Sequence, residues 1–186
     1  MSLGIKDLNG NAVQLPNYDV AYGFASASLA PGAAPTDIIQ LTGAAGVVTR
    51  IKRIMLTLQS GTVAGGQTYT LQRRSTAASG GTGNTRVLAK FDNRAGVAAA
   101  STVLTDFTAA PTAGTAVGGP IRAAALVSAA TAASTAKDTI VWDFTTRMDQ
   151  APILNGASDF LCVTQSAVLA TGQTLSYEVQ VEEGTN

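Results

Sequence analysis

The chain has 186 residues, no histidine and one cysteine, Cys162; only 13% of its residues are charged, and the formal net charge is zero. The missing histidine excludes a Ser-His-Asp or Cys-His catalytic arrangement and a histidine metal site, and one cysteine excludes an internal disulfide. We therefore expect a protein that is not an enzyme, needs no cofactor or metal, and acts through its surface.

The first 19 residues are predicted to form an extended arm. Asn9-Gly10 is a turn signal, and Leu15-Pro16 favours extended backbone because proline restricts the residue before it. The arm holds few apolar residues at any period, so we expect it to be poorly ordered until it contacts a neighbouring chain. The remainder, residues 20–186, is predicted to form a single β-sandwich domain.

Period-two alternation of apolar and polar residues predicts strands along this domain. The longest candidate, residues 47–59, is predicted to form a hairpin with residues 68–74 across a glycine-containing turn. Residues 123–133 are rich in alanine and fit a short helix, but interspersed Thr and Ser favour a strand and a loop. Residues 21–29 form an apolar segment of small residues, and residues 151–154 lead into the Asn155-Gly156 turn. The candidate strands in chain order span residues 37–41, 47–59, 68–74, 85–91, 102–104, 121–127, 139–144, 159–165 and 174–182.

Many short strands without intervening helices predict an all-β fold, an antiparallel β-sandwich that is jelly-roll-like rather than immunoglobulin-like. Cys162 lies in an apolar run and is predicted to be a small core hydrophobe rather than a nucleophile. The alternating strands place these residues in a shared core: Leu56, Leu58, Tyr69, Leu71, Trp142, Phe144, Leu175, Tyr177 and Val179.

Charge is distributed unevenly along the chain. Residues 50–94 carry eight basic residues against Asp92, and residues 138–183 carry seven acidic residues against Arg147. The two regions can pair across strands within one chain, which we expect for at least half of these charges, or they can pair between subunits. The candidate protein-interface residues are Arg50, Lys52, Arg53, Arg73 and Arg74.

Other functions have weaker support. Asp143 and Asp149 flank an aromatic strand, but the pattern places Asp143 on an outward face and Asp149 in a turn, so a glycosidase pair is not expected. The glycine-rich residues 79–83 lack the lysine of a phosphate loop. The basic cluster has few aromatic neighbours, so nucleic-acid binding is not expected as the main role. The N-terminus lacks signal-peptide features and no apolar run is long enough to span a bilayer, so we expect assembly in the cytoplasm without a membrane partner.

Several short motifs follow one another along nearly the whole chain. They are Ile5-Lys6-Asp7 before Gly10, the basic strand at residues 48–54, Arg73-Arg74-Ser75-Thr76 before Gly80-Gly81-Thr82, Ala109-Ala110-Pro111-Thr112, Trp142-Asp143-Phe144, and Ile153-Leu154-Asn155-Gly156. In this order the chain resembles a group of virion structural proteins of tailed bacteriophages and prophages.

The resemblance implies a non-enzymatic particle component. We expect a capsid cement or decoration protein that stabilises contacts between major-capsid subunits, with the major capsid protein and copies of itself as partners and the virion as its location. The alternative is a structural component of the tail, tail fibre or neck, with possible binding of host glycans.

Overall fold

The computed structural model of the protein describes most of the predicted domain. It covers residues 20–25, 36–59, 61–91, 98–105, 107, 111–128, 130, 137–146, 150–167 and 169–185. The predicted arm, residues 1–19, lies outside these described residues. Among them, no helix has the length and apolar character needed to cross a membrane.

The regular elements of the described chain are all strands, which confirms the all-β prediction. In chain order they are β1 (Val20–Ala25), β2 (Thr36–Thr42), β3 (Val47–Gln59), β4 (Gly65–Arg74), β5 (Asn84–Arg86), β6 (Ala89–Lys90), β7 (Thr102–Thr105), β8 (Arg122–Ser128), β9 (Lys137–Asp143), β10 (Ile153–Asn155), β11 (Phe160–Gln165) and β12 (Thr174–Thr185).

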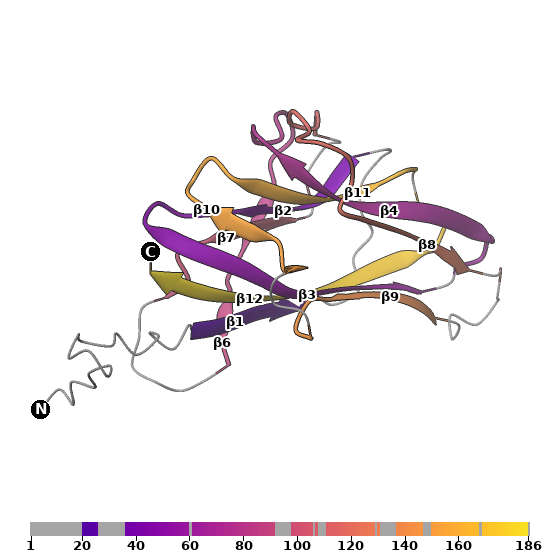
Figure 1. The fold of residues 1–186 in the computed structure, drawn as a ribbon. Coiled ribbons are helices and arrows are strands. Elements are labelled where there is room, and N and C mark those ends of the chain that lie inside the picture. The colour runs from indigo at the N-terminus through magenta and orange to yellow at the C-terminus, as the bar shows by residue number, and fades with distance from the viewer. Residues whose placement is uncertain are drawn as a thin grey trace, which may run out of the picture.

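The strands form two antiparallel sheets, which are the lower and upper layers of Figure 1. Sheet one has the order β10-β3-β12-β1-β6, with β9 also paired to β3, and sheet two has the order β5-β7-β2-β11-β4-β8. The principal pairs are nested: β1 with β12, β2 with β11, β3 with β9, and β4 with β8. Successive pairs alternate between the sheets, so the chain folds like one long hairpin rolled into two layers. The predicted antiparallel sandwich is confirmed.

The core lies between the sheets and is built from the inward side chains of both. In sheet one, β12 pairs with β3 so that Tyr177 lies opposite Leu56 and Val179 lies opposite Ile54. Alternate side chains of a strand share a face, so the period-two pattern brings these apolar groups to the same side. All nine predicted core residues are buried in one apolar cluster, including Trp142.

The predicted hairpin between residues 47–59 and 68–74 is wrong. These segments are β3 and β4, but β3 belongs to sheet one, whereas β4 belongs to sheet two between β11 and β8. The connection therefore crosses between layers. It packs against the turn before β12 so closely that a Cβ on Gly61 would lie 2.5 Å from the backbone nitrogen of Gln173. The alternation of apolar and polar residues specified which face of each strand is buried, but not which strand pairs with it.

The predicted strand at residues 85–91 is divided between the sheets. Residues 84–86 form β5 and pair with β7 in sheet two, whereas residues 89–90 form β6 and pair with β1 in sheet one. Leu88 lies between these segments and is buried in the core cluster, while Val87 is 84% exposed. The chain thus changes layers where one apolar side chain enters the core.

Residues 122–128 form β8, which confirms the strand interpretation for the first part of the ambiguous alanine-rich segment. Leu126 and Ser128 are buried on the inward face, whereas Ala123, Ala125 and Val127 are exposed. Residues 129 and 131–133 of that segment lie outside the described residues.

Candidate functional site

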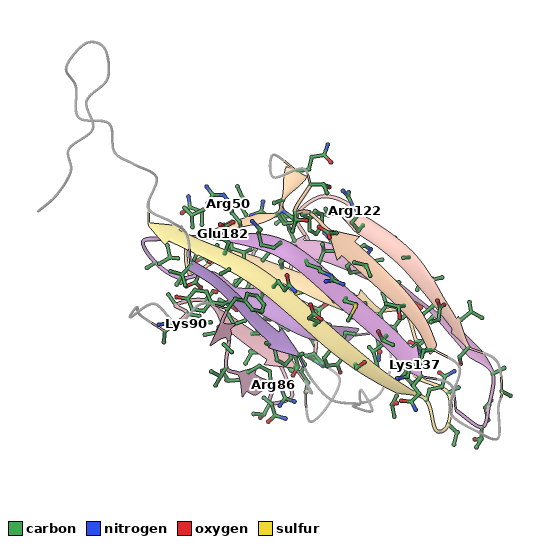
Figure 2. The ribbon with its side chains drawn as sticks, turned by 90° about the horizontal axis from the view of Figure 1, so that it is seen from below. Arg50, Arg86, Lys90, Arg122, Lys137 and Glu182 are labelled. Atoms are coloured by element: carbon green, nitrogen blue, oxygen red, sulfur yellow. The ribbon has the colours of Figure 1, made fainter. Side chains whose placement is uncertain are left out.

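The five basic residues predicted as an interface come from two strands that belong to different sheets. Arg50, Lys52 and Arg53 belong to β3 in sheet one, whereas Arg73 and Arg74 end β4 in sheet two. Figure 2 shows sheet one from its outer side, with the labelled basic residues spread around the molecule and Arg50 close to Glu182. The Arg73 side chain nevertheless reaches sheet one, because it donates to the carbonyl of Ile153, which lies opposite Arg50 in the pairing of β10 with β3.

Most of the predicted interface cations form ion pairs with acidic residues of the same chain. On sheet one, the Lys52 ammonium lies 2.7 Å from Glu182, and the Arg53 guanidinium lies 3.8 Å from Glu178. These partners come from the adjacent strand β12, and the register shifts between Gln180 and Val181 because Lys52 is an extra residue in β3. Internal pairing of the basic and acidic regions is therefore confirmed for these residues.

Arg73 and Arg74 are adjacent in sequence but occupy different environments. The Arg73 side chain is 39% exposed; it donates to the Ile153 carbonyl at 2.6 Å and lies 3.6 Å from Asp159. The Arg74 side chain is only 10% exposed and lies 2.8 Å from Asp37, whose side chain is fully buried. Because consecutive residues of a strand point to opposite faces, Arg74 extends over the outer face of sheet two.

Asp37, Arg74 and Thr164 form a buried polar cluster, which we name the cap cluster. The Thr164 hydroxyl donates to Asp37 Oδ1 at 2.5 Å and accepts a hydrogen bond from Arg74 Nη2 at 3.2 Å. Asp37 lies opposite Thr164 at a bulge in the pairing of β2 with β11. Asp37 Oδ2 and Arg74 Nε are buried without a hydrogen-bond partner in the described structure. Sequence reasoning did not identify this cluster.

Two segments, residues 75–83 and 111–118, cover the cap cluster and are named the cap. They lie above sheet two in Figure 1, on the side away from sheet one. Ser79 and Thr112 exchange two backbone hydrogen bonds, at 2.7 and 3.0 Å, that join the segments. Arg74 Nη1 donates to the Gly114 carbonyl at 3.0 Å, which ties the cap to the buried cluster. The glycine-rich residues 79–83 therefore belong to this covering layer.

Cys162 is buried, as predicted, but it does not belong to the core between the sheets. It lies on the outer face of sheet two, in register with Gln40 on β2 and Gln72 on β4. Burial, followed by the neighbouring Asp37 carboxylate, raises the pKa of the Cys162 thiol. The thiol therefore stays protonated near neutral pH and is a poor nucleophile.

Asp143 is the described member of the carboxylate pair considered as a glycosidase site. Asp143 is on the exposed face of β9, and hydrogen bonds from the Thr145 hydroxyl and backbone amide hold the pKa of Asp143 below its usual range. It thus remains ionised at neutral pH rather than acting as an acid. Asp149 lies outside the described residues. In the part of the chain that the structure describes, no three Cys, Asp or Glu residues are grouped to hold a metal ion.

No family model, no curated protein and no solved structure matches this chain.

Proposed function

We propose that the protein is a non-enzymatic structural component of a tailed-bacteriophage particle and, more specifically, a capsid cement or decoration protein. The observation that carries this proposal is the nested strand order. Its main strands form the orders β1-β12-β3-β9 in one sheet and β2-β11-β4-β8 in the other, and this nesting supports the jelly-roll arrangement that we propose for the sandwich. Jelly rolls are common among viral capsid domains. The sequence resemblance to phage virion proteins points in the same direction.

The charge arrangement supports a role in packing against other proteins. Three of the predicted interface cations form ion pairs within the chain and are therefore largely neutralised. The pairs are Lys52 with Glu182, Arg53 with Glu178, and Arg73 with Asp159. A surface neutralised in this way has a weak long-range field. Binding through shape complementarity and uncharged contacts suits a protein that stabilises subunits already assembled in a shell.

The described aromatic residues favour the capsid over a glycan-binding tail component. Sugar-binding surfaces commonly present aromatic rings, because an apolar ring face stacks on a sugar. Trp142 is buried in the core, and Phe91 is 61% exposed but packs over Gly23, where an added Cβ would lie 2.4 Å from the ring. The ring thus covers a glycine in β1 rather than lining a cleft.

The test is to add the purified full chain to heads that lack it and to image the particles by cryo-electron microscopy. We expect additional density with the size and two-layered shape of this β-sandwich, lying across the contacts between major-capsid subunits. Heads decorated with the protein should also survive heating or osmotic shock that breaks undecorated heads. Binding only to tails or necks, or binding to neither, would overturn the capsid proposal.

A further inference from the structure

β8 is an open edge of sheet two and has few of the features that usually block edge pairing. It is hydrogen-bonded to β4 on one side, and no strand among the described residues pairs with it on the other. Figure 2 shows Arg122, its first residue, at the rim of the sandwich. After Arg122, the six residues to Ser128 contain no charge and no proline. Charged residues, prolines and very short edge strands normally prevent such an edge from pairing with another chain.

The other edge strands are protected in the ways that β8 is not. β5, β6 and β10 have only two or three residues each. β9 has seven residues, the same length as β8, but it carries Lys137, Asp138 and Asp143. The contrast marks β8 as the long, uncharged edge of the described sandwich.

The backbone direction along β8 identifies the groups that face outward. The Val127 amide donates to the Asp138 side chain at 2.9 Å and therefore points away from β4. In an antiparallel ladder, outward and inward backbone groups alternate along the strand. The amides and carbonyls of Ala123 and Ala125 thus also point outward, and no hydrogen bond to them is found on that side among the described residues. Both side chains are small and exposed.

We propose that β8 pairs with β8 of a second copy of this chain, antiparallel about a two-fold axis at Ala124. In this register Ala123 of each copy exchanges two hydrogen bonds with Ala125 of the other, and the Val127 amide keeps its bond to Asp138. An identical strand is the favoured occupant because antiparallel pairing makes the edge self-complementary. Arg122 lies opposite Leu126 of the other copy, which keeps the two guanidinium groups apart.

This contact is short, so the dimer is expected to be weak and concentration-dependent, below the standard interface of about 1,600 Å². The inference extends the proposed function by naming the surface through which copies associate. On a particle, neighbouring copies would be held at a high effective concentration, which strengthens weak pairing. The dimer is tested in solution and particle binding is tested on heads, so either can fail without the other.

The first experiment is sedimentation equilibrium of the full chain from about 1 µM to about 1 mM, a range that brackets moderate and weak dimers. We expect the mass to rise with concentration from 18.8 kDa toward twice that value. Ala125→Pro should remain monomeric, because the lost amide points outward and proline is tolerated at such edge positions. Circular dichroism should confirm that this variant is folded.

The matched charge variants are Ala125→Lys and Thr68→Lys. Thr68 is also exposed and lies opposite Ala125 on β4, one strand further from the edge. We expect Ala125→Lys to abolish dimerisation, because it places charge at the contact, and Thr68→Lys to leave it unchanged. A wild-type chain that stays monomeric at the highest concentration, or equal dimerisation by all variants, would overturn the proposal.

Cysteine cross-linking tests the register. In the proposed dimer, residues 123 and 125 of opposite copies lie about 5.5 Å apart at Cα, within the range for a disulfide. A mixture of Ala123→Cys and Ala125→Cys chains should therefore form a disulfide dimer on oxidation, whereas either variant alone should cross-link much less. Cys162 is buried and does not compete. Equal cross-linking of the single variants would refute this register.

Discussion

Replacing Arg74 with methionine isolates the contribution of the buried ion pair beneath the cap. The substitution removes the guanidinium that lies 2.8 Å from Asp37 and that also binds the Gly114 carbonyl. It leaves the fully buried Asp37 carboxylate with a hydrogen bond from the Thr164 hydroxyl but without a cation beside it. A buried carboxylate without a neutralising partner is costly because it has lost its hydration.

The expected loss is large on the scale of single substitutions. Breaking a buried pair by removing one member costs about 3–5 kcal/mol of unfolding free energy, and that range applies here because both side chains are at least nine-tenths buried. For a chain of this length, the loss corresponds to a decrease of about 6–20 °C in Tm. Urea titration followed by circular dichroism measures the free energy of unfolding directly.

Arg73→Met is the matched control. Arg73 is the preceding residue of the same strand, but its side chain and that of its partner Asp159 are each 39% exposed. Water screens such a pair, so we expect the control to cost less than about 1 kcal/mol. The double variant Arg74→Met/Asp37→Leu should be more stable than the sum of its two single variants predicts, because it leaves no unpaired buried charge.

The reasoning is refuted if Arg74→Met is no more destabilising than Arg73→Met. It is also refuted if the Arg74 and Asp37 substitutions are additive, since additivity would mean that the two groups do not interact.

Three further outcomes are expected. Gly114→Ala should loosen the cap and lower Tm, because the new Cβ would lie 1.9 Å from the carbonyl oxygen of Thr76 in the other cap segment. A protease digest should then cleave the cap segments faster than in the parent chain. Cys162 should react with a thiol reagent near neutral pH only after unfolding, since burial raises its pKa and blocks access; rapid reaction of the native chain would contradict its placement. Deleting residues 1–19 should weaken binding to heads. An Arg50/Lys52/Arg53 triple-Glu variant should lose little binding, because attachment is proposed to run through neutral contacts; a loss that is seen at low salt and disappears at 1 M salt, where the Debye length is about 3 Å, would show that these charges face the capsid instead.

The sequence by itself determined which segments are strands and which of their faces are buried. Residues 47–59 form β3 with the predicted bounds, and the alternation in residues 174–182 correctly placed Leu175, Tyr177 and Val179 in the core. This information is local, because successive side chains of a strand point to opposite faces whatever strand lies beside it. The strand interpretation of residues 122–128 succeeded for the same reason.

The sequence did not determine the candidate interface, although it supplied all five residues. Arg50, Lys52 and Arg53 were expected to act together with Arg73 and Arg74, but the tertiary structure separates them into two sheets. The partners of Lys52 and Arg53 are more than a hundred residues away along the chain. Their identity depends on strand order and on the bulge at Lys52 in β3, which no local pattern reveals.

Only the tertiary structure decided which strands are neighbours and what covers the outer face of sheet two. The turn between β3 and β4 resembles a hairpin turn, yet the strands enter different layers, and residues 85–91 divide between the sheets where Leu88 enters the core. Asp37 and Arg74 look like exposed charges in sequence, but the cap buries them against Thr164. Strand pairing and burial on the second face depend on contacts between residues far apart in sequence, whereas the period-two pattern reports only on adjacent residues.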